Sequence, residues 1–388
     1  MVPTVQVSSK GAHRLRRQNP WCYRTEVVAP PEAAVPGQVV LAVDGQKNPI
    51  GLCFYATTSP LALRLLTRDV KEPIDEAFFK RRLEASLARR APYRGRDAMR
   101  LVHGEADQLP GLFVDQYGTG LVLQTLSEGA DARKDMFARL LVELTSATHI
   151  VCRDDASGRD FEGLPREVKT LLGAGPLVFT FHEGKNRFQV DLEKDMKTGS
   201  FLDQVDNHLR AGDFAFGEGL DCFSYHGGFA LAMAGKCTSV LAIEQDARAS
   251  ERARENVQRN GLSNVTVENA NAFDLLKKFD KEGRKFDTIV LDPPGLAKRK
   301  EGVGTALRAY HELNLRAFRL LRPNGILLTC SCSGKVGLPD FEKMAFSAAD
   351  DARRMVQLLE RRGAGLDHPV LASLHETEYL KSLLFRAL

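Results

Sequence analysis

The sequence predicts an α/β protein in which a doubly wound parallel sheet follows a small β-barrel and a linking α/β segment. From about residue 185, apolar strand-like runs alternate with helix-like segments, which is the order that parallel sheets require. Before about residue 72 the runs are short and are broken by proline- and glycine-rich stretches, as in small barrels. A chain of 388 residues has room for two or three domains of ordinary size.

The first predicted domain, residues 1–72, holds the runs VVLAVD and IGLCFYAT. The second, residues 73–183, opens with IDEAFFKRRLEASLARR, whose apolar residues recur at helical spacing. Its strand-like runs are GLFVD, GLVLQTL and HIVCRD, with a helix over 131–147. The third domain, residues 184–388, has the predicted strands GLDCF, SVLAIE, NVTVENA, FDTIVLDPP and GILLTCSCS. Ligands of such a sheet bind at the carboxyl ends of its strands.

Composition is that of a soluble globular protein, with 43% hydrophobic and 27% charged residues. No apolar stretch near the start resembles a secretory signal, and no run approaches the roughly 18 residues that span a bilayer. We therefore expect a cytoplasmic protein without a membrane partner. The 7 cysteines are scattered and match no zinc spacing, so neither a metal site nor a disulfide is expected.

Positive charge is clustered although the net charge is only +4. Such clusters neutralise phosphates, and aromatic residues beside them stack on bases, so RNA binding is one interpretation. A solvated helix face is the other, and the sequence leaves both open. The first cluster lies beside Trp21 and contains Lys10, Arg14, Arg16 and Arg17; the second contains Lys80, Arg81, Arg82, Arg89, Arg90, Arg94, Arg96 and Arg100.

The predicted strand ends carry the residues of a cofactor site. The first strand is followed by the turn SYHGGF, in which Gly227 and Gly228 allow close approach of a ligand. Glu244 ends the second strand, where a carboxylate can hold a ribose diol. The turn lacks the G-x-G-x-x-G spacing of dinucleotide enzymes, which disfavours a nicotinamide cofactor. S-adenosylmethionine, which has a ribose but no phosphate, fits these residues better.

The fourth strand ends in Asp292-Pro293-Pro294, whose carboxylate is expected to face a planar substrate. Gly295 stands where enzymes that methylate base amino groups carry an aromatic residue, so that chemistry is less well supported.

The fifth strand ends with Cys330 and Cys332. A thiolate that adds to carbon 6 of a pyrimidine makes carbon 5 nucleophilic, which is covalent catalysis. Cys332, flanked by serines and a glycine, is the predicted nucleophile. Cys330 lies within the apolar run and is expected to be buried packing, as is Cys222.

These motifs, taken together and in order, resemble the ribosomal RNA large subunit methyltransferase I family. The resemblance covers nearly the whole chain, from KGAHRLRRQNPWCYRTE through RLVHGEADQLPGLFVDQYG, VDLEKDMKTGSFLDQVDN, CFSYHGGFA, VLDPPGL, AYHELN and CSCSG to DHPVLASLHETEYLK. It implies an RNA-binding PUA domain, a linking α/β domain with RNA contacts, and a Rossmann-like class I methyltransferase domain. It also implies S-adenosylmethionine as cofactor, carbon 5 of a cytosine in 23S ribosomal RNA or a ribosomal particle as target, and a homodimer.

Carried over by position, the resemblance implies Cys332 as nucleophile and Asp292 as a contact of the base or the methyl donor. His368 would support the site. Val205 stands where relatives carry an arginine, and Asn271 where an acid would meet the adenine amino group, from which asparagine can also accept. The implied cofactor residues are Lys197, Thr198, Phe201, Gln204, Phe223, Ser224, Gly227, Gly228, Glu244, Asn271 and Asp292.

Two alternatives to cytosine methylation stay open. One is an RNA methyltransferase acting on guanine, in which Cys332 would be inert. The other is a ribosome-assembly protein that binds RNA and has a cofactor pocket but no catalysis.

Overall fold

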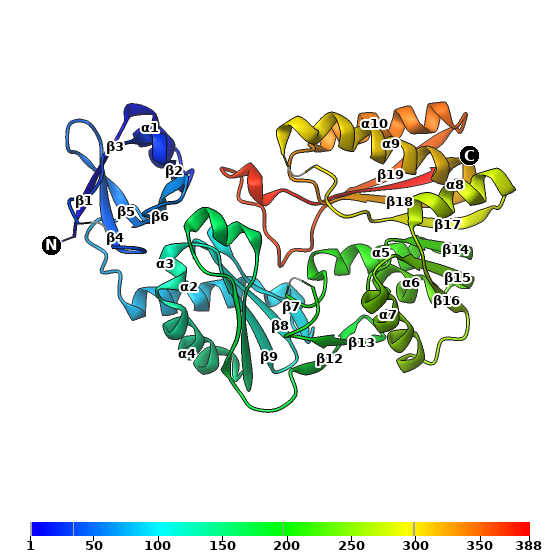
Figure 1. Ribbon diagram of the computed structural model, residues 1–388, viewed down its shortest axis with the longest axis horizontal. Coiled ribbons are helices and arrows are strands. Elements are labelled where there is room, and N and C mark those ends of the chain that lie inside the picture. The colour runs from blue at the N-terminus through cyan, green and yellow to red at the C-terminus, as the bar shows by residue number, and fades with distance from the viewer. Residues whose placement is uncertain (1, 34, 197, 298) are drawn as a thin grey trace. The chain divides into compact units, whose positions relative to one another are not determined.

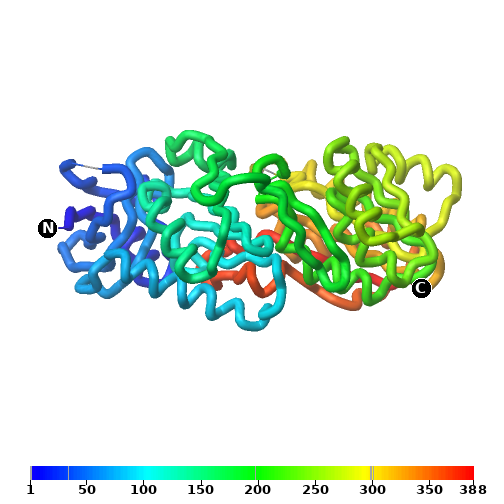
Figure 2. The backbone as a smooth tube through the Cα atoms, turned by 90° about the horizontal axis from the view of Figure 1, so that it is seen from below, coloured from blue at the N-terminus to red at the C-terminus, as the bar shows by residue number. Residues whose placement is uncertain are grey.

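The structure is a computed structural model that describes residues 2–33, 35–196, 198–297 and 299–388 (Figure 1). Contacts divide the chain into two compact units. The first comprises the chain up to Phe181 together with Val190–Ser200 and Leu366–Thr377; the second comprises His182–Gln189, Phe201–Gly365 and Glu378–Leu388. In Figure 2 the orange-red segment Leu366–Thr377 lies beside the cyan chain of the first unit.

The first unit begins with a six-stranded sheet in the order β2-β6-β5-β4-β1-β3. Its core is made by small and branched apolar residues on the inward faces, such as Val5, Val40 and Leu63. The helix α1 starts where the Ser8 hydroxyl accepts the Gly11 amide. The elements are β1 (Thr4–Val7), α1 (Ser9–Arg16), β2 (Trp21–Tyr23), β3 (Val27–Ala29), β4 (Val39–Val43), β5 (Pro49–Tyr55) and β6 (Leu61–Thr67).

A second sheet in the same unit has five strands in the order β11-β10-β9-β8-β7. The aromatic residues Phe78, Phe79 and Phe137 pack in the core beneath its helices. The elements are α2 (Glu76–Arg89), β7 (Ala98–His103), β8 (Leu112–Tyr117), β9 (Gly120–Thr125), α3 (Glu128–Asp131), α4 (Lys134–Thr145), β10 (His149–Asp154) and β11 (Glu167–Leu172). Strands β12 (Val178–Glu183) and β13 (Asn186–Asp191) pair separately.

The second unit is built on a seven-stranded sheet in the order β16-β15-β14-β17-β18-β20-β19. Strands β14 to β18 are parallel, and β20 is antiparallel to both of its neighbours. Helices cover both faces, with α9 and α10 on one and α6 and α7 on the other (Figure 1). This confirms the predicted doubly wound sheet, whereas the last two strands were not predicted.

The elements of the second unit alternate as the sequence predicts until the last two strands. They are α5 (Val205–Phe214), β14 (Gly217–Cys222), α6 (Gly228–Ala234), β15 (Cys237–Glu244), α7 (Ala247–Arg259), β16 (Val265–Asn269), α8 (Ala272–Glu282), β17 (Phe286–Leu291), α9 (Val303–Leu320), β18 (Leu321–Ser331), α10 (Leu338–Asp351), β19 (Val356–Arg362) and β20 (Lys381–Ala387). None of the helices in the described ranges combines the length and apolar composition that a bilayer crossing needs.

Candidate active site

The turn after β14 has an unusual backbone. Phe223, Tyr225 and Gly227 all have positive φ, at 66°, 49° and 87°. Positive φ is costly for residues other than glycine, and such strain gathers at functional sites. The Ser224 amide donates to the Ile243 carbonyl, which fixes the turn against β15. The hydrogen bond therefore helps to hold Phe223 and Tyr225 in backbone conformations that these residues do not favour on their own.

Gly228 is required by close packing under this turn. A Cβ atom there would lie 2.4 Å from the His208 ring. His208 is buried and its Nδ1 lies 2.7 Å from a Glu183 carboxylate oxygen. Burial opposes protonation of His208, but the Glu183 carboxylate outweighs it and raises the pKa of the imidazole. The second glycine of SYHGGF thus serves packing against a buried ion pair.

Two buried polar atoms beside the turn lack a hydrogen-bond partner among the described residues. They are Ser224 Oγ and Asp221 Oδ1, and the other Asp221 oxygen accepts the Ala230 amide at 2.9 Å. Burial raises the pKa of Asp221 to about 7. Buried polar atoms are nearly always partnered, so a polar group of a ligand or a water could complete the hydrogen bonds of these two.

Glu244 lies at the end of β15 with both carboxylate oxygens fixed. One accepts the Tyr225 amide at 2.9 Å and the other accepts the Asp246 amide at 2.8 Å. Each carboxylate oxygen has a further lone pair, so the group can still accept from the two hydroxyls of a ribose. The predicted ribose contact thus lies at the carboxyl end of the strand next to β14, with its orientation set by the backbone.

Asn271 has a structural role that the sequence did not suggest. Its side-chain oxygen caps α8 by accepting the Phe273 and Asp274 amides at 2.9 and 3.4 Å. Its amide nitrogen donates to Gln245 at 3.3 Å. The lone pairs predicted to receive an adenine amino group are therefore already used, and adenine contact by Asn271 stays a prediction.

The remaining predicted cofactor residues are distributed over both units. Phe201 contacts Tyr225 edge to face at a centroid distance of 4.8 Å in the second unit. Gln204 is buried there, and its oxygen accepts Asn207 Nδ2 at 2.7 Å. Thr198 lies in the first unit, where its hydroxyl donates to Asp115. Lys197 lies outside the described residues.

His368 also lies in the first unit. It is buried, and its Nδ1 lies 2.9 Å from an oxygen of Asp367. Its ring meets that of His103 at a centroid distance of 5.3 Å. Support of the active site by His368 stays a prediction.

The loops after β17 and β18 bring Cys332 to the proline pair. Cys332 Sγ lies 4.0 Å from the Pro293 carbonyl oxygen, and a Cβ at Gly295 would be 3.7 Å from the same sulfur. Asp292 is half-buried, and its amide donates to the Cys222 carbonyl at 3.3 Å. The DPPG loop and the predicted nucleophile therefore face each other at the carboxyl edge of the sheet.

The two neighbouring cysteines differ as predicted. Cys330 is fully buried, and its thiol donates to Ser382 Oγ at 3.3 Å. Burial raises the pKa of that thiol. Cys332 is half-buried, whereas the other six cysteines, all within the described ranges, are buried. Cys222 is among the buried ones and packs in the sheet core.

A hydrogen-bond network around Cys332 was not assigned from the sequence. Ser333 Oγ accepts the Ala297 amide at 3.1 Å and lies 2.9 Å from the Tyr310 hydroxyl. Ser331 Oγ donates to the same hydroxyl at 3.0 Å. Ser333 thus joins the DPPG loop to the loop that carries Cys332. Tyr310 lies in the AYHELN motif, which is the sequence feature that could have pointed to it.

Lys381 is the second group that the sequence did not assign. It is the first residue of β20, and its Nζ donates to the Ser333 and Tyr379 carbonyls at 2.7 and 2.8 Å. Burial lowers the pKa of Lys381 to about 8. A buried ammonium close to the predicted nucleophile favours the anionic form of that thiol.

Many of the basic residues are paired with acids from other segments, and RNA contact by the two clusters stays a prediction. Arg90 is buried and donates to both oxygens of Asp107, and Arg100 pairs with Asp115 at 2.8 Å. In the first cluster Arg16 pairs with Asp44 at 2.7 Å. Most of these charges are therefore neutralised within the fold.

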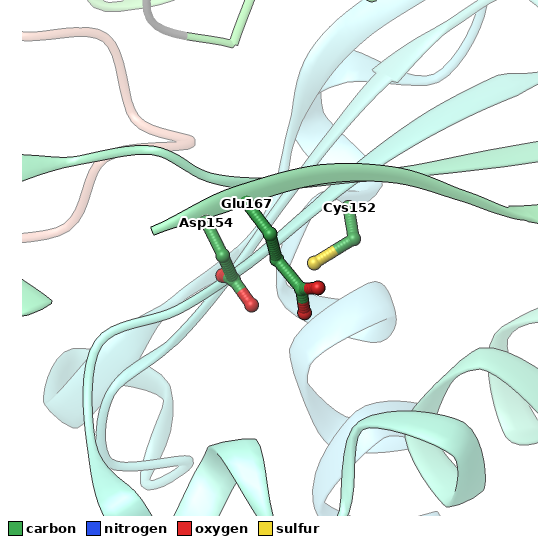
Figure 3. A group of neighbouring side chains, drawn as sticks. All are labelled: Cys152, Asp154 and Glu167. Atoms are coloured by element: carbon green, nitrogen blue, oxygen red, sulfur yellow. The ribbon is translucent and has the colours of Figure 1, made fainter. Parts of the chain in front are cut away.

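A group with metal-ligating side chains lies in the first unit, apart from the predicted site residues in sequence. Cys152 and Asp154 on β10 and Glu167 on β11 point into the same space (Figure 3). Lys134 contacts both carboxylates, with its Nζ 2.9 Å from Glu167. Lys134 thus supplies the positive charge that a metal ion would otherwise bring to these two carboxylates.

Comparisons with known proteins agree with this architecture. Residues 5–68 match the profile of a PUA-like domain, and residues 88–386 match that of an S-adenosylmethionine-dependent methyltransferase. The chain is 36% identical over 98% of both chains to Ribosomal RNA large subunit methyltransferase I of Klebsiella pneumoniae. It is 38% identical over 96% of both chains to the protein of that name in Shewanella amazonensis.

Two solved structures share the fold along the full length of both chains. A candidate S-adenosylmethionine-dependent methyltransferase from Streptococcus mutans superposes with a TM-score of 0.82 at 19% identity. A candidate methyltransferase solved with SAH has a TM-score of 0.84 at 20% identity. These structures confirm the predicted fold class, and the match of residues 88–386 to the methyltransferase profile confirms the predicted cofactor, S-adenosylmethionine.

Proposed function

The chain belongs to the ribosomal RNA large subunit methyltransferase I family, and we propose that it methylates carbon 5 of a cytosine in 23S ribosomal RNA through a covalent adduct of Cys332. The observation that carries the proposal is the half-buried Cys332 facing the Asp292-Pro293-Pro294 loop at the carboxyl edge of the sheet. This edge is where a doubly wound sheet binds its ligands.

The cofactor residues proposed from the second unit are those around the strained turn. Glu244 would accept from the ribose hydroxyls, and Ser224 Oγ and Asp221 Oδ1, which lack a partner among the described residues, would meet polar groups of the ligand. Phe223 and Gly227 shape the turn through their positive φ. S-adenosylmethionine, when bound, supplies the methyl group on a sulfonium centre.

In this proposal Cys332 activates the cytosine ring for methylation. Its thiolate adds to carbon 6 of cytosine, a carbon–sulfur bond forms, and electron density moves to carbon 5. Carbon 5 can then accept a methyl group, after which loss of the carbon 5 proton expels the thiolate and restores the ring. Asp292, at the start of the facing loop, would hold the base by its ring edge.

The RNA substrate is supported by the PUA-like domain at residues 5–68 and by the names of the relatives. Exposed cations such as Lys10 and Arg94 are the part of the basic clusters that would meet phosphates. A ribosomal RNA substrate would place the activity in the cytoplasm. A homodimer and a ribosomal particle as substrate stay predictions.

The test uses 23S RNA transcribed with 5-fluorocytidine, incubated with protein and S-adenosylmethionine and run on a denaturing gel. Fluorine cannot leave as a proton, so a carbon 6 nucleophile should be trapped as a stable protein–RNA adduct. The adduct is expected with the unmodified protein and with Cys330→Ala, and should be lost with Cys332→Ala.

Two outcomes would contradict the proposal. Methyl transfer to ordinary RNA without any adduct would favour guanine as the target, with Cys332 inert. Absence of methyl transfer to any RNA would favour an RNA-binding assembly protein that has the pocket but no catalysis.

A further inference from the structure

Lys381 is a buried lysine whose side chain reaches the segment around Cys332. In the antiparallel pairing of β18 with β20, Lys381 lies opposite Ser331, the residue before Cys332. The Lys381 side chain then donates to the carbonyl of Ser333, the residue after Cys332, at 2.7 Å. Lys381 therefore contacts the chain on both sides of the proposed nucleophile.

Burial of this lysine is expensive and is only partly offset. Lys381 is 4% exposed. Its hydrogen-bond partners among the described residues are two neutral carbonyls, those of Ser333 and Tyr379. In those same residues it forms no ion pair with a carboxylate within 4.0 Å. A cation held in this way favours a neighbouring anion, because two charges removed from water attract each other strongly.

Cys332 is the group that can supply that anion. A thiolate at Cys332 and the Glu378 carboxylate both favour the charged form of Lys381. Coulomb interaction is mutual, so the charged lysine favours the thiolate to the same extent. Among the described residues, the Tyr310 phenol and the Cys330 thiol are further ionisable groups whose electrostatics involve this thiol.

We propose that the Lys381 ammonium stabilises the thiolate of Cys332. Lys381 is then a positioning residue that raises the fraction of Cys332 present as the thiolate. The inference rests on the proposed function, in which that thiolate attacks the base. The thiol proton passes to solvent before the carbon–sulfur bond forms, and at neutral pH the ammonium keeps its own protons. The carbonyls of Ser333 and Tyr379 hold the ammonium in place, so it can stabilise the thiolate without a change in its own position.

The test measures the rate of Cys332 alkylation by iodoacetamide against pH in the full-length protein. The other six cysteines are buried, and Cys332→Ala gives the background rate. In the unmodified protein the rate should reach half its maximum below about pH 8.5, the value of an ordinary thiol. A midpoint at or above that pH would overturn the inference without any variant at Lys381.

Lys381→Met removes the charge and keeps the length of the side chain. It should slow alkylation at pH 7 about tenfold and move the midpoint up by about one pH unit, as expected for the loss of one close charge. Lys381→Arg should restore most of the rate. The control is Lys335→Met, which removes an exposed charge three residues from Cys332 and should leave the profile unchanged.

The alkylation and adduct experiments separate the two ideas. If the unmodified protein gives the 5-fluorocytidine adduct but Lys381→Met, shown to be folded by circular dichroism, keeps the same alkylation profile, only the inference about Lys381 fails. If no adduct forms although methyl transfer occurs, the proposed function fails whatever the thiol profile.

Discussion

Arg90 and Asp107 form a buried two-pronged ion pair in the first unit, with N–O distances of 2.7 and 2.6 Å. Asp107 is inaccessible to solvent and Arg90 is 5% exposed. The same carboxylate accepts Arg89 Nε at 3.0 Å and the His103 amide at 2.7 Å. A residue that the sequence offered as an RNA contact therefore joins the end of α2 to the segment that follows β7.

Replacing Arg90 with methionine should destabilise the protein rather than weaken RNA binding specifically. Removing one partner leaves the Asp107 carboxylate buried without its main counter-ion, which typically costs about 3–5 kcal/mol. Urea denaturation followed by circular dichroism would measure the loss. Unfolding at an unchanged urea midpoint would contradict the structural role of the pair.

Arg94 provides the matched comparison for RNA binding, because it is exposed and only four residues away. Arg94→Ala should leave the urea midpoint within about 0.5 kcal/mol of the unmodified protein, as is usual for surface changes. If Arg94 meets phosphate, the variant should bind RNA more weakly, with a smaller dependence of affinity on salt. Filter binding at several salt concentrations would check this.

Removal of the Tyr310 hydroxyl should loosen the two loops around Cys332. Tyr310→Phe leaves Ser331 Oγ without its acceptor and Ser333 Oγ without one of its partners, at a cost of about 1–3 kcal/mol. We expect lower stability and slower formation of the fluorocytidine adduct. Ser382→Ala, which removes a partner of the buried Cys330, should leave the rate of adduct formation unchanged.

Substitution of Glu244 should weaken cofactor binding. Glu244→Gln removes the negative charge and turns an amide group toward the Tyr225 or Asp246 N–H, so one of these hydrogen bonds is lost. A charged hydrogen bond contributes about 1.5–3 kcal/mol, so affinity for S-adenosylhomocysteine should fall about tenfold or more in calorimetry. Glu268→Gln, at an exposed position on the next strand, should bind normally.

The raised pKa of Asp221 should make the stability of the folded protein depend on pH. Its pKa is raised by burial from 3.8 to about 7, so the folded state holds the proton more tightly than the unfolded state. That contribution is complete below about pH 4 and is lost as pH rises toward 7. Asp221→Asn should therefore gain stability over the unmodified protein as pH is raised from 5 to 8, by a few kcal/mol.

Thermal denaturation of both proteins in matched buffers would measure this gain. An equal difference between the two proteins at every pH would show that the Asp221 carboxyl does not titrate in this range. Loss of the cofactor's stabilising effect in the variant at all pH values would in addition support the proposed contact of Asp221 with the ligand.

Several features followed from the sequence because they depend on neighbours along the chain. The alternation of apolar runs with helical segments predicted the order of β14 to β18, and the residues that follow each run predicted Glu244, Asp292 and Cys332 at one edge of the sheet. The apolar surroundings of Cys330 likewise predicted its burial, which the structure confirms. Local pattern is sufficient here since parallel strands present their carboxyl ends together.

The tertiary structure alone decided which charges are paired and which residues surround the nucleophile. The acids that neutralise Arg90 and Arg100 come from later strands and loops, so the basic segment looked unpaired in the sequence. Lys381 reaches the chain beside Cys332 because β20 returns antiparallel to β18, a pairing between residues about fifty positions apart. Hydrophobic periodicity assigns a residue to a strand face, but long-range strand pairing and burial determine which charged group meets which thiol.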